Sequence, residues 1–199
     1  MIDVKSVLES LATQVSRPPA EDIDISSDVV RKYAESMAAK GYLHSESSIL
    51  AIEKYLQGYN LWLNGDCGTG KTLFFKRLNP RIKVFRMIDT TGISIDELRE
   101  WMEDARNKEI MIDDIGVEPI FNYYGNRFEI FPWIVEKRLE VTARTHLTSN
   151  LTAKAMAERY GRRALDRLLY FKKITFKGES KRTPLRKTAG NADLRHSRL

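Results

Sequence analysis

The segment GDCGTGKT, residues 65–72, limits the possible folds of this chain more strongly than any other part of its sequence. It fits the pattern G-x-x-x-x-G-K-[S/T], with the apolar residues 61–63 before it and a helical pattern over 71–78 after it. This strand–loop–helix context predicts a phosphate-binding loop, because glycines let backbone N–H groups surround phosphate oxygens at a helix N-terminus. A glycine turn that only starts a helix is the alternative.

The loop residues have separate predicted roles toward a nucleoside triphosphate. Lys71 should reach the β and γ phosphates, and Thr72 should be a ligand of Mg²⁺. The other predicted nucleotide-binding residues of the loop are Gly65, Asp66, Cys67, Gly68, Thr69 and Gly70. ATP and Mg²⁺ are therefore the expected ligands.

A second segment, residues 109–114, is an apolar strand pattern that ends in two acids. We expect Asp113 to hold the Mg²⁺ shell and Asp114 to polarise the water that attacks the γ phosphate. Two acids after a strand can also be a solvated helix cap. The phosphate loop favours the catalytic interpretation, since both strands should end at the same edge of one sheet.

Short apolar runs alternate with helical patterns from residue 59 onward. Strands are expected over 60–64, 82–88, 109–113, 145–149 and 172–176, and helices near 71–78, 94–106, 126–142, 152–160 and 161–169. This alternation predicts an α/β fold: a parallel five-stranded sheet with helices on both faces. Two further helical patterns, near 27–41 and 45–56, form a helical lead-in to the first strand.

Length and composition indicate one globular domain with short appendages. The chain has 199 residues, one cysteine and a formal net charge of +6. A single cysteine forms no internal disulfide, and we see no signal peptide or membrane span, so we expect a cytoplasmic protein. The expected organisation is an arm over 1–25, the nucleotide-binding domain over 26–182, with its lead-in over 26–58, and a tail over 183–199.

The C-terminal end of the chain is strongly basic. Residues 177–199 contain seven Lys or Arg and two acids, and they lack aromatic residues. We expect a mobile tail that attracts polyanions such as nucleic acid, or one that only aids solubility.

Polar and basic residues after the fourth predicted strand extend the candidate site. Asn150 follows that strand and could orient the attacking water, although Asn is also a common helix N-cap. Residues 158–168, ERYGRRALDRL, carry arginines that could complete the ATP site of a neighbouring subunit or form a solvated basic face. Arg182 could reach a phosphate within its own subunit or belong to the tail.

These segments together resemble the DnaC/DnaI-type helicase loaders and the related IstB-type helper ATPases of the AAA+ superfamily. The resemblance covers residues 61–182 and depends on the phosphate loop, IDDIG (112–116), TSNL (148–151) and RYGRRALDRL (159–168). It implies an AAA+ type P-loop NTPase fold, with Asn150 at the sensor-1 position. It further implies that Arg167 is the arginine finger, with Arg163 as the next candidate, and that Arg182 is the sensor-2 arginine.

The resemblance also implies a function. It indicates an ATPase that forms a homo-oligomer on ATP and DNA, binds single-stranded DNA and places a hexameric replicative helicase. The alternatives are an IstB-like transposition helper, a nucleotide-switched adaptor with negligible turnover, and a small-molecule kinase, against which the arginine run argues. The segment 119–133 mixes aromatic residues with Arg127, which suits stacking on single-stranded bases, although core or intersubunit packing would explain most of these residues.

Overall fold

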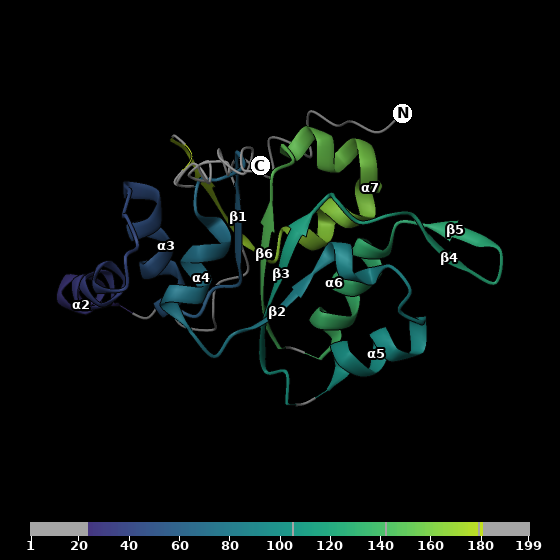
Figure 1. Ribbon diagram of the computed structural model, residues 1–199, viewed down its shortest axis with the longest axis horizontal. Helices are drawn as coiled ribbons and strands as arrows, with labels where there is room; N and C mark the ends of the chain where they lie inside the picture. The colour runs from purple at the N-terminus through teal and green to yellow at the C-terminus, as the bar shows by residue number, and fades with distance from the viewer. Residues whose placement is uncertain (1–23, 105, 142, 179, 181–199) are drawn as a thin grey trace, which may run out of the picture.

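Five parallel strands form one sheet in the order β2–β3–β6–β1–β7 (Figure 1). The structure is a computed structural model that describes residues 24–104, 106–141, 143–178 and 180. The strands are β1 (Leu61–Gly65), β2 (Lys83–Arg86), β3 (Glu109–Ile115), β6 (Arg144–Ser149) and β7 (Lys172–Phe176). All five strands of the sequence prediction are present, and the predicted parallel sheet is confirmed.

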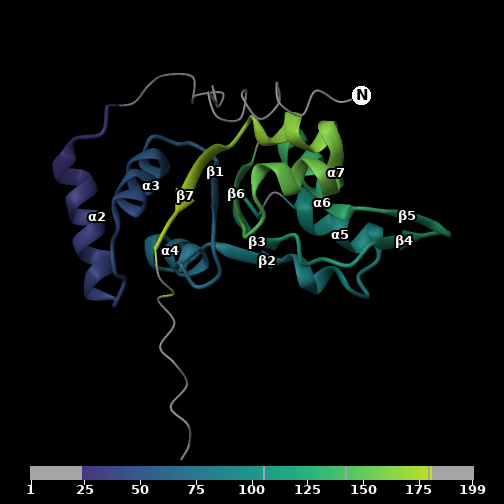
Figure 2. The same ribbon diagram turned by 90° about the horizontal axis from the view of Figure 1, so that it is seen from above.

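Helices cover both faces of the sheet, as Figure 2 shows. The helices are α2 (Ser27–Ala39), α3 (Glu46–Leu56), α4 (Lys71–Leu78), α5 (Ile95–Glu103), α6 (Ile130–Glu140) and α7 (Ala153–Leu168), with a 3-10 turn η1 (Met87–Thr90) after β2. Side chains of β1 alternate between two cores: Leu61 and Leu63 pack with α2, α3 and α4, whereas Trp62 packs with α5, α6 and α7. This alternation follows from the two-residue period of a strand.

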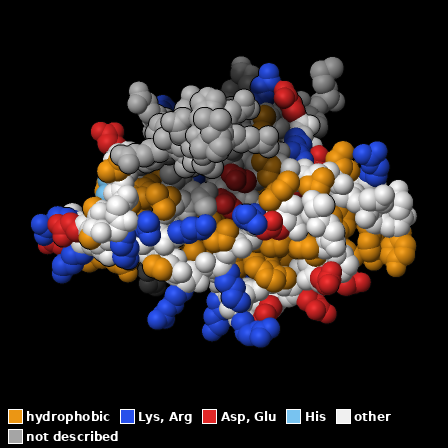
Figure 3. All heavy atoms as spheres, viewed as in Figure 1, with side chains coloured by type: hydrophobic (Ala, Val, Ile, Leu, Met, Phe, Trp, Pro, Cys, Tyr) orange, Lys and Arg blue, Asp and Glu red, His pale blue; other side chains and the backbone are white. Residues whose placement is uncertain are grey.

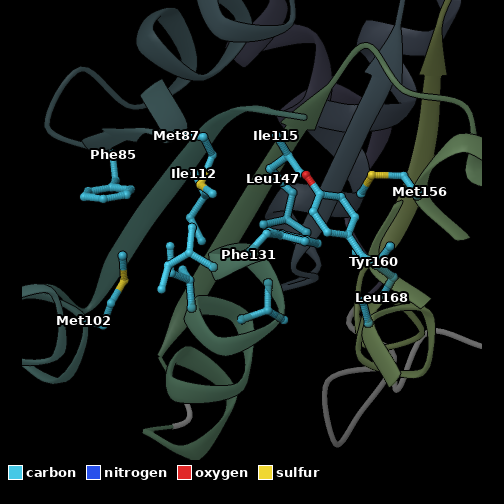
Figure 4. Packing of buried hydrophobic residues seen from close by; sticks show 14 of the residues in the cluster. Phe85, Met87, Met102, Ile112, Ile115, Phe131, Leu147, Met156, Tyr160 and Leu168 are labelled. Carbon is cyan, nitrogen blue, oxygen red and sulfur yellow. The ribbon is translucent and has the colours of Figure 1, made fainter. Parts of the chain in front are cut away.

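The second core packs α6 and α7 against the sheet. Phe131 of α6 lies against Tyr160 of α7, with ring centroids 4.9 Å apart, and Leu147 of β6 lies beside them (Figure 4). Gly161 has a φ of 74° and interrupts the helical geometry of α7. The break separates the two helices that the sequence predicted over 152–160 and 161–169.

The largest difference from the sequence prediction lies before α6. The predicted helix over 126–142 is wrong at its start, because residues 126–128 belong to a two-stranded antiparallel hairpin, β4 (Phe121–Tyr123) and β5 (Asn126–Phe128). Tyr124 and Gly125 both have positive φ, 48° and 80°, which reverses the chain within two residues. The hairpin extends from the body at the end opposite α2 (Figures 1 and 2).

The other element bounds differ from the prediction by a few residues. Strand β2 ends at Arg86, since the backbone turns into η1, and α5 ends at Glu103. The lead-in helices α2 and α3 are present. Ser45 caps α3 by accepting a hydrogen bond from the Ser48 N–H. Most of the predicted arm and the whole predicted tail lie outside the described residues.

Candidate functional site

The phosphate loop joins β1 to α4 at the carboxyl edge of the sheet. Gly70 precedes α4 with a φ of 93°, a left-handed conformation that favours glycine. Gly65 permits a close approach to β7, because a Cβ there would lie 2.1 Å from the carbonyl oxygen of Phe176. The two glycines let the loop turn tightly into the helix, as a phosphate-binding loop requires.

Lys71 is directed across the loop and not toward solvent. Its Nζ donates hydrogen bonds to the carbonyl oxygens of Gly65 and Asp66, at 2.7 and 2.9 Å, and to Oδ1 of Asn150, at 2.7 Å. Burial lowers the pKa of Lys71, and nearby acids, with Asp114 the strongest among them, oppose that shift. These hydrogen bonds hold the ammonium group between the loop and the tip of β6.

Asp113 lies at the meeting point of three elements. Its Oδ1 accepts a hydrogen bond from Thr72 at 2.7 Å and another from Thr148 at 2.6 Å. Asp113 is 4% exposed, so these hydroxyl donors account for much of what stabilises the carboxylate. The structure therefore brings together the two residues predicted to hold Mg²⁺.

Asp114 has a φ of 57°, which is uncommon for a residue with a side chain. Its backbone N–H donates to Oγ1 of Thr148 at 2.9 Å, which fixes this strained position. Asp114, Lys71 and Asn150 line one pocket of about 380 Å³. The other lining residues are Cys67, Gly68, Gly70, Thr72, Leu73 and Val117. A pocket of this size is suitable for a small ligand such as a nucleotide.

Asn150 does not cap the following helix. The N-cap of α7 is Thr152, whose hydroxyl accepts a hydrogen bond from the Ala155 N–H at 3.1 Å. The side chain of Asn150 instead accepts from Lys71 and lines the pocket. The capping alternative for Asn150 is therefore wrong, and its role toward the attacking water stays a prediction.

The residues present fit the oxygen ligands through which a protein would hold Mg²⁺ beside a nucleotide. Thr72 and Asp113 offer a hydroxyl and a carboxylate oxygen already within 2.7 Å of each other. No cluster of three or more His, Cys, Asp or Glu side chains able to hold a metal occurs among the described residues. A nucleotide-bound Mg²⁺ needs no such cluster, because phosphate oxygens and water supply its remaining ligands.

The two candidate finger arginines share one carboxylate. Arg163 donates to both carboxylate oxygens of Glu136, at 2.7 and 2.9 Å, and Arg167 donates to one of them at 3.2 Å. These hydrogen bonds, led by the one from Arg163, lower the pKa of Glu136. Both arginines lie on α7 and neither lines the pocket of the same chain.

The predicted sensor arginine, Arg182, lies outside the described residues. The described chain reaches Ser180 close to the loop, since a Cβ at Gly68 would lie 2.2 Å from the Ser180 hydroxyl oxygen.

Thr148 had no predicted role, although its side chain connects Asp113 and Asp114. Thr148 is fully buried on β6, donates to Asp113 and accepts from the Asp114 N–H. Its signal in the sequence is weak, because Thr148 is one of several polar residues of β6 and only its place two positions before Asn150 distinguishes it.

A second set of contacts missed in the sequence ties α7 to the loop after β3. Arg159 donates to the carbonyl oxygens of Gly116 and Glu118, the latter at 2.7 Å, and forms an ion pair with Glu129 at 3.0 Å. Glu118 is 3% exposed and accepts from the Gly116 N–H at 2.8 Å and from the Tyr160 hydroxyl. This arginine of the 158–168 run therefore has a contact within its own subunit.

Comparison with solved structures agrees with this topology. A crystal structure of DnaI superposes with a TM-score of 0.54 at 18% sequence identity, over 74% of this chain and 94% of that chain. The fold is of the AAA+ type. No protein-family model matches the sequence, and no curated protein matches it. The predicted AAA+ type of P-loop NTPase fold is thereby confirmed, with β6 as the strand that separates β1 from β3 in space.

Two DnaA structures have lower similarity. AMPPCP-bound DnaA from Aquifex aeolicus has a TM-score of 0.46 at 15% identity, over 69% of this chain and 49% of that one. Domain III of the Thermotoga maritima replication initiation protein DnaA has a TM-score of 0.40 at 11% identity, over 79% of this chain and 65% of that one.

Within the described ranges, no helix has the length and apolar character to cross a bilayer.

Proposed function

We propose that this protein binds and hydrolyses ATP as an oligomer and uses the nucleotide cycle to act on single-stranded DNA, where it places a hexameric replicative helicase. One observation carries the proposal. A single pocket at the carboxyl edge of the sheet combines Lys71 of the loop, Asp114 after β3 and Asn150 after β6. A cation, a carboxylate and an amide in this arrangement suit stabilisation of a γ phosphate and orientation of a water.

The chain's own residues have distinct parts in the reaction. Lys71 exchanges its contacts with carbonyl oxygens and Asn150 for phosphate oxygens, which releases the Asn150 amide. Asp114 and Asn150 then orient a water in line with the bond between the γ phosphorus and its bridging oxygen. Mg²⁺, held by Thr72 and Asp113, would neutralise phosphate charge when bound. An arginine of a neighbouring subunit, Arg167 in this proposal, adds positive charge in the transition state.

The decisive experiment is ATP turnover per subunit against protein concentration, with and without single-stranded DNA. We expect turnover to rise with concentration and with DNA, because the site is completed by a second copy. Lys71→Ala should abolish ATP binding, and Asp114→Asn should retain binding but lose turnover. A flat, near-zero rate in a wild-type protein that binds ATP would favour the adaptor function and contradict the ATPase.

The helicase partner is tested separately. A purified hexameric helicase should load onto a protein-coated circle of single-stranded DNA faster in the presence of the wild-type protein than in the presence of Lys71→Ala. The transposition-helper alternative predicts no effect on loading.

A further inference from the structure

The hairpin β4–β5 carries the most exposed large hydrophobic side chain among the described residues. Tyr124 is 89% exposed at the tip, and its neighbour Tyr123 is 38% exposed. The two rings form an edge-on pair with centroids 4.6 Å apart. Figure 3 shows a group of hydrophobic-class side chains at this end of the molecule. These two rings contribute little to the core, so packing within the folded chain does not explain why the hairpin carries them.

The backbone at the tip makes a tyrosine unfavourable there. Tyr124 occupies the first central position of a two-residue turn with a φ of 48°. Asn followed by Gly is the preferred pair in such a turn, because Asn tolerates positive φ better than an aromatic residue does. The chain therefore places a large ring at a position where an asparagine would give a more stable hairpin. Strain of this kind points to a binding role.

The base of the hairpin is firmly attached to the body. Phe121 is 9% exposed and packs against Phe128 across the ribbon, with ring centroids 5.6 Å apart. Arg159 holds the preceding loop through the carbonyl oxygens of Gly116 and Glu118. The tip is thus presented on a fixed support that begins at the loop directly after Asp114.

Side chains around the tip suit a polyanion with unpaired bases. Residues 120–128 include no acid, and Arg127 is their one charged residue. Arg127 lies opposite Asn122 in the register, so the two share the face that does not carry Phe121. Guanidinium and amide groups bind phosphate and base edges, and aromatic rings stack on unpaired bases.

We propose that the β4–β5 hairpin binds a single nucleic-acid strand, with Tyr124 as the ring on which a base stacks. This inference rests on the proposed action on single-stranded DNA and assigns that action to a site. A stable protein interface buries about 800 Å² per partner, whereas the hairpin consists of two strands of three residues each. A base stacked on one ring needs far less area.

The test compares Tyr124→Asn with the wild type in fluorescence anisotropy of a labelled oligo(dT) with a non-hydrolysable ATP analogue. Asn suits the turn, so the variant should keep or raise its melting temperature while losing the ring. We expect affinity to fall by about tenfold, within the range for one lost stacking contact. Tyr33→Ala, at the opposite end on α2, should bind as the wild type does. Arg127→Gln should reduce affinity and the salt dependence of binding.

The outcomes separate this inference from the function on which it rests. Wild-type affinity in Tyr124→Asn would overturn the hairpin assignment while DNA action stands. Failure of the wild type to bind the oligonucleotide would overturn both. Wild-type DNA affinity together with lost binding of a purified helicase would make the hairpin a protein-docking element and overturn the inference. A photo-crosslink from 5-iodouracil to the peptide that contains residues 121–128 would support it directly.

Discussion

Nζ of Lys71 donates a hydrogen bond of 2.7 Å to Oδ1 of Asn150, a residue 79 positions later in the chain. The contact joins the phosphate loop to the tip of β6 and holds the lysine away from solvent. A γ phosphate would compete with Asn150 for the same ammonium group. Binding of a triphosphate would therefore break the hydrogen bond between Lys71 and Asn150.

Asn150→Ala should lower kcat by about 100-fold while ATP affinity changes by less than about threefold. The amide orients the water in the proposed reaction, whereas Lys71 still binds phosphate. Asn150→Asp should instead weaken ATP binding, because a carboxylate would hold Lys71 and repel the γ phosphate. Nucleotide titration and steady-state turnover measure both effects. An Asn150→Ala variant that loses affinity as strongly as turnover would contradict this role.

Thr148→Val should lower the free energy of unfolding by about 1–3 kcal/mol. The substitution keeps the shape but removes the hydroxyl that donates to Asp113 and accepts from the Asp114 N–H. Thr148→Ser retains the hydroxyl and should stay closer to the wild type. Urea unfolding at pH 7.5 measures the difference. Equal stability of the Val and Ser variants would show that the hydroxyl is not needed.

Arg167→Ala should reduce turnover by about 1000-fold at high protein concentration, and Arg163→Ala should have a much smaller effect. Arg163 makes two short hydrogen bonds to Glu136, whereas Arg167 makes a single longer one and can leave it more readily. Mixing Arg167→Ala with Lys71→Ala provides the check. The second variant has an intact arginine and the first an intact loop, so their mixture should recover activity. No recovery, or wild-type turnover in Arg167→Ala, would remove the finger assignment.

Stability should fall as the pH drops from about 6.5 toward 4. His146 is fully buried, and burial lowers its pKa to about 4. Its Nδ1 accepts the Leu61 N–H at 3.1 Å, so Nε2 carries the proton and donates to Glu109 at 3.0 Å. The unfolded chain therefore binds more protons than the folded chain between pH 6.5 and 4. Through His146, the free energy of unfolding should be about 2 kcal/mol lower at pH 5 than at pH 7.5. His146→Asn should show a weaker pH dependence in urea unfolding, and an unchanged slope would contradict the prediction.

Arg159→Gln should uncouple DNA binding from the nucleotide. Its contacts to Gly116 and Glu118 join the loop after Asp114 to the base of the hairpin. In the wild type we expect the ATP analogue to change oligo(dT) affinity by about threefold or more, which corresponds to a modest coupling energy. The variant should bind DNA equally with and without the analogue. Arg162→Gln, exposed on the same helix, is the control. If the ATP analogue changed the oligo(dT) affinity of Arg159→Gln as much as that of the wild type, coupling through Arg159 would be excluded.

Local sequence patterns were sufficient for the sheet and for the groups that follow its strands. The glycines and Lys71 act within a few residues of each other, and a strand that ends in Asp113 and Asp114 has its own apolar signature. Parallel strands bring such ends to one edge of the sheet, so a site around Lys71 could be predicted from the sequence. The roles assigned to these residues remain predictions.

The register between distant segments decided the rest. Thr148 contacts Asp113 across 35 positions, and Arg159 reaches Gly116 across 43, so neither contact has a local pattern. Residues 126–128 pair with 121–123 and do not begin the helix, because Gly125 accepts the positive φ that the reversal needs and Phe121 packs against Phe128 across the hairpin. Residue order therefore determined which chemical groups lie at the sheet edge. The packing of α7 against the loop after β3 decided which side chains hold these groups at the sheet edge. It also decided the direction in which the hairpin extends.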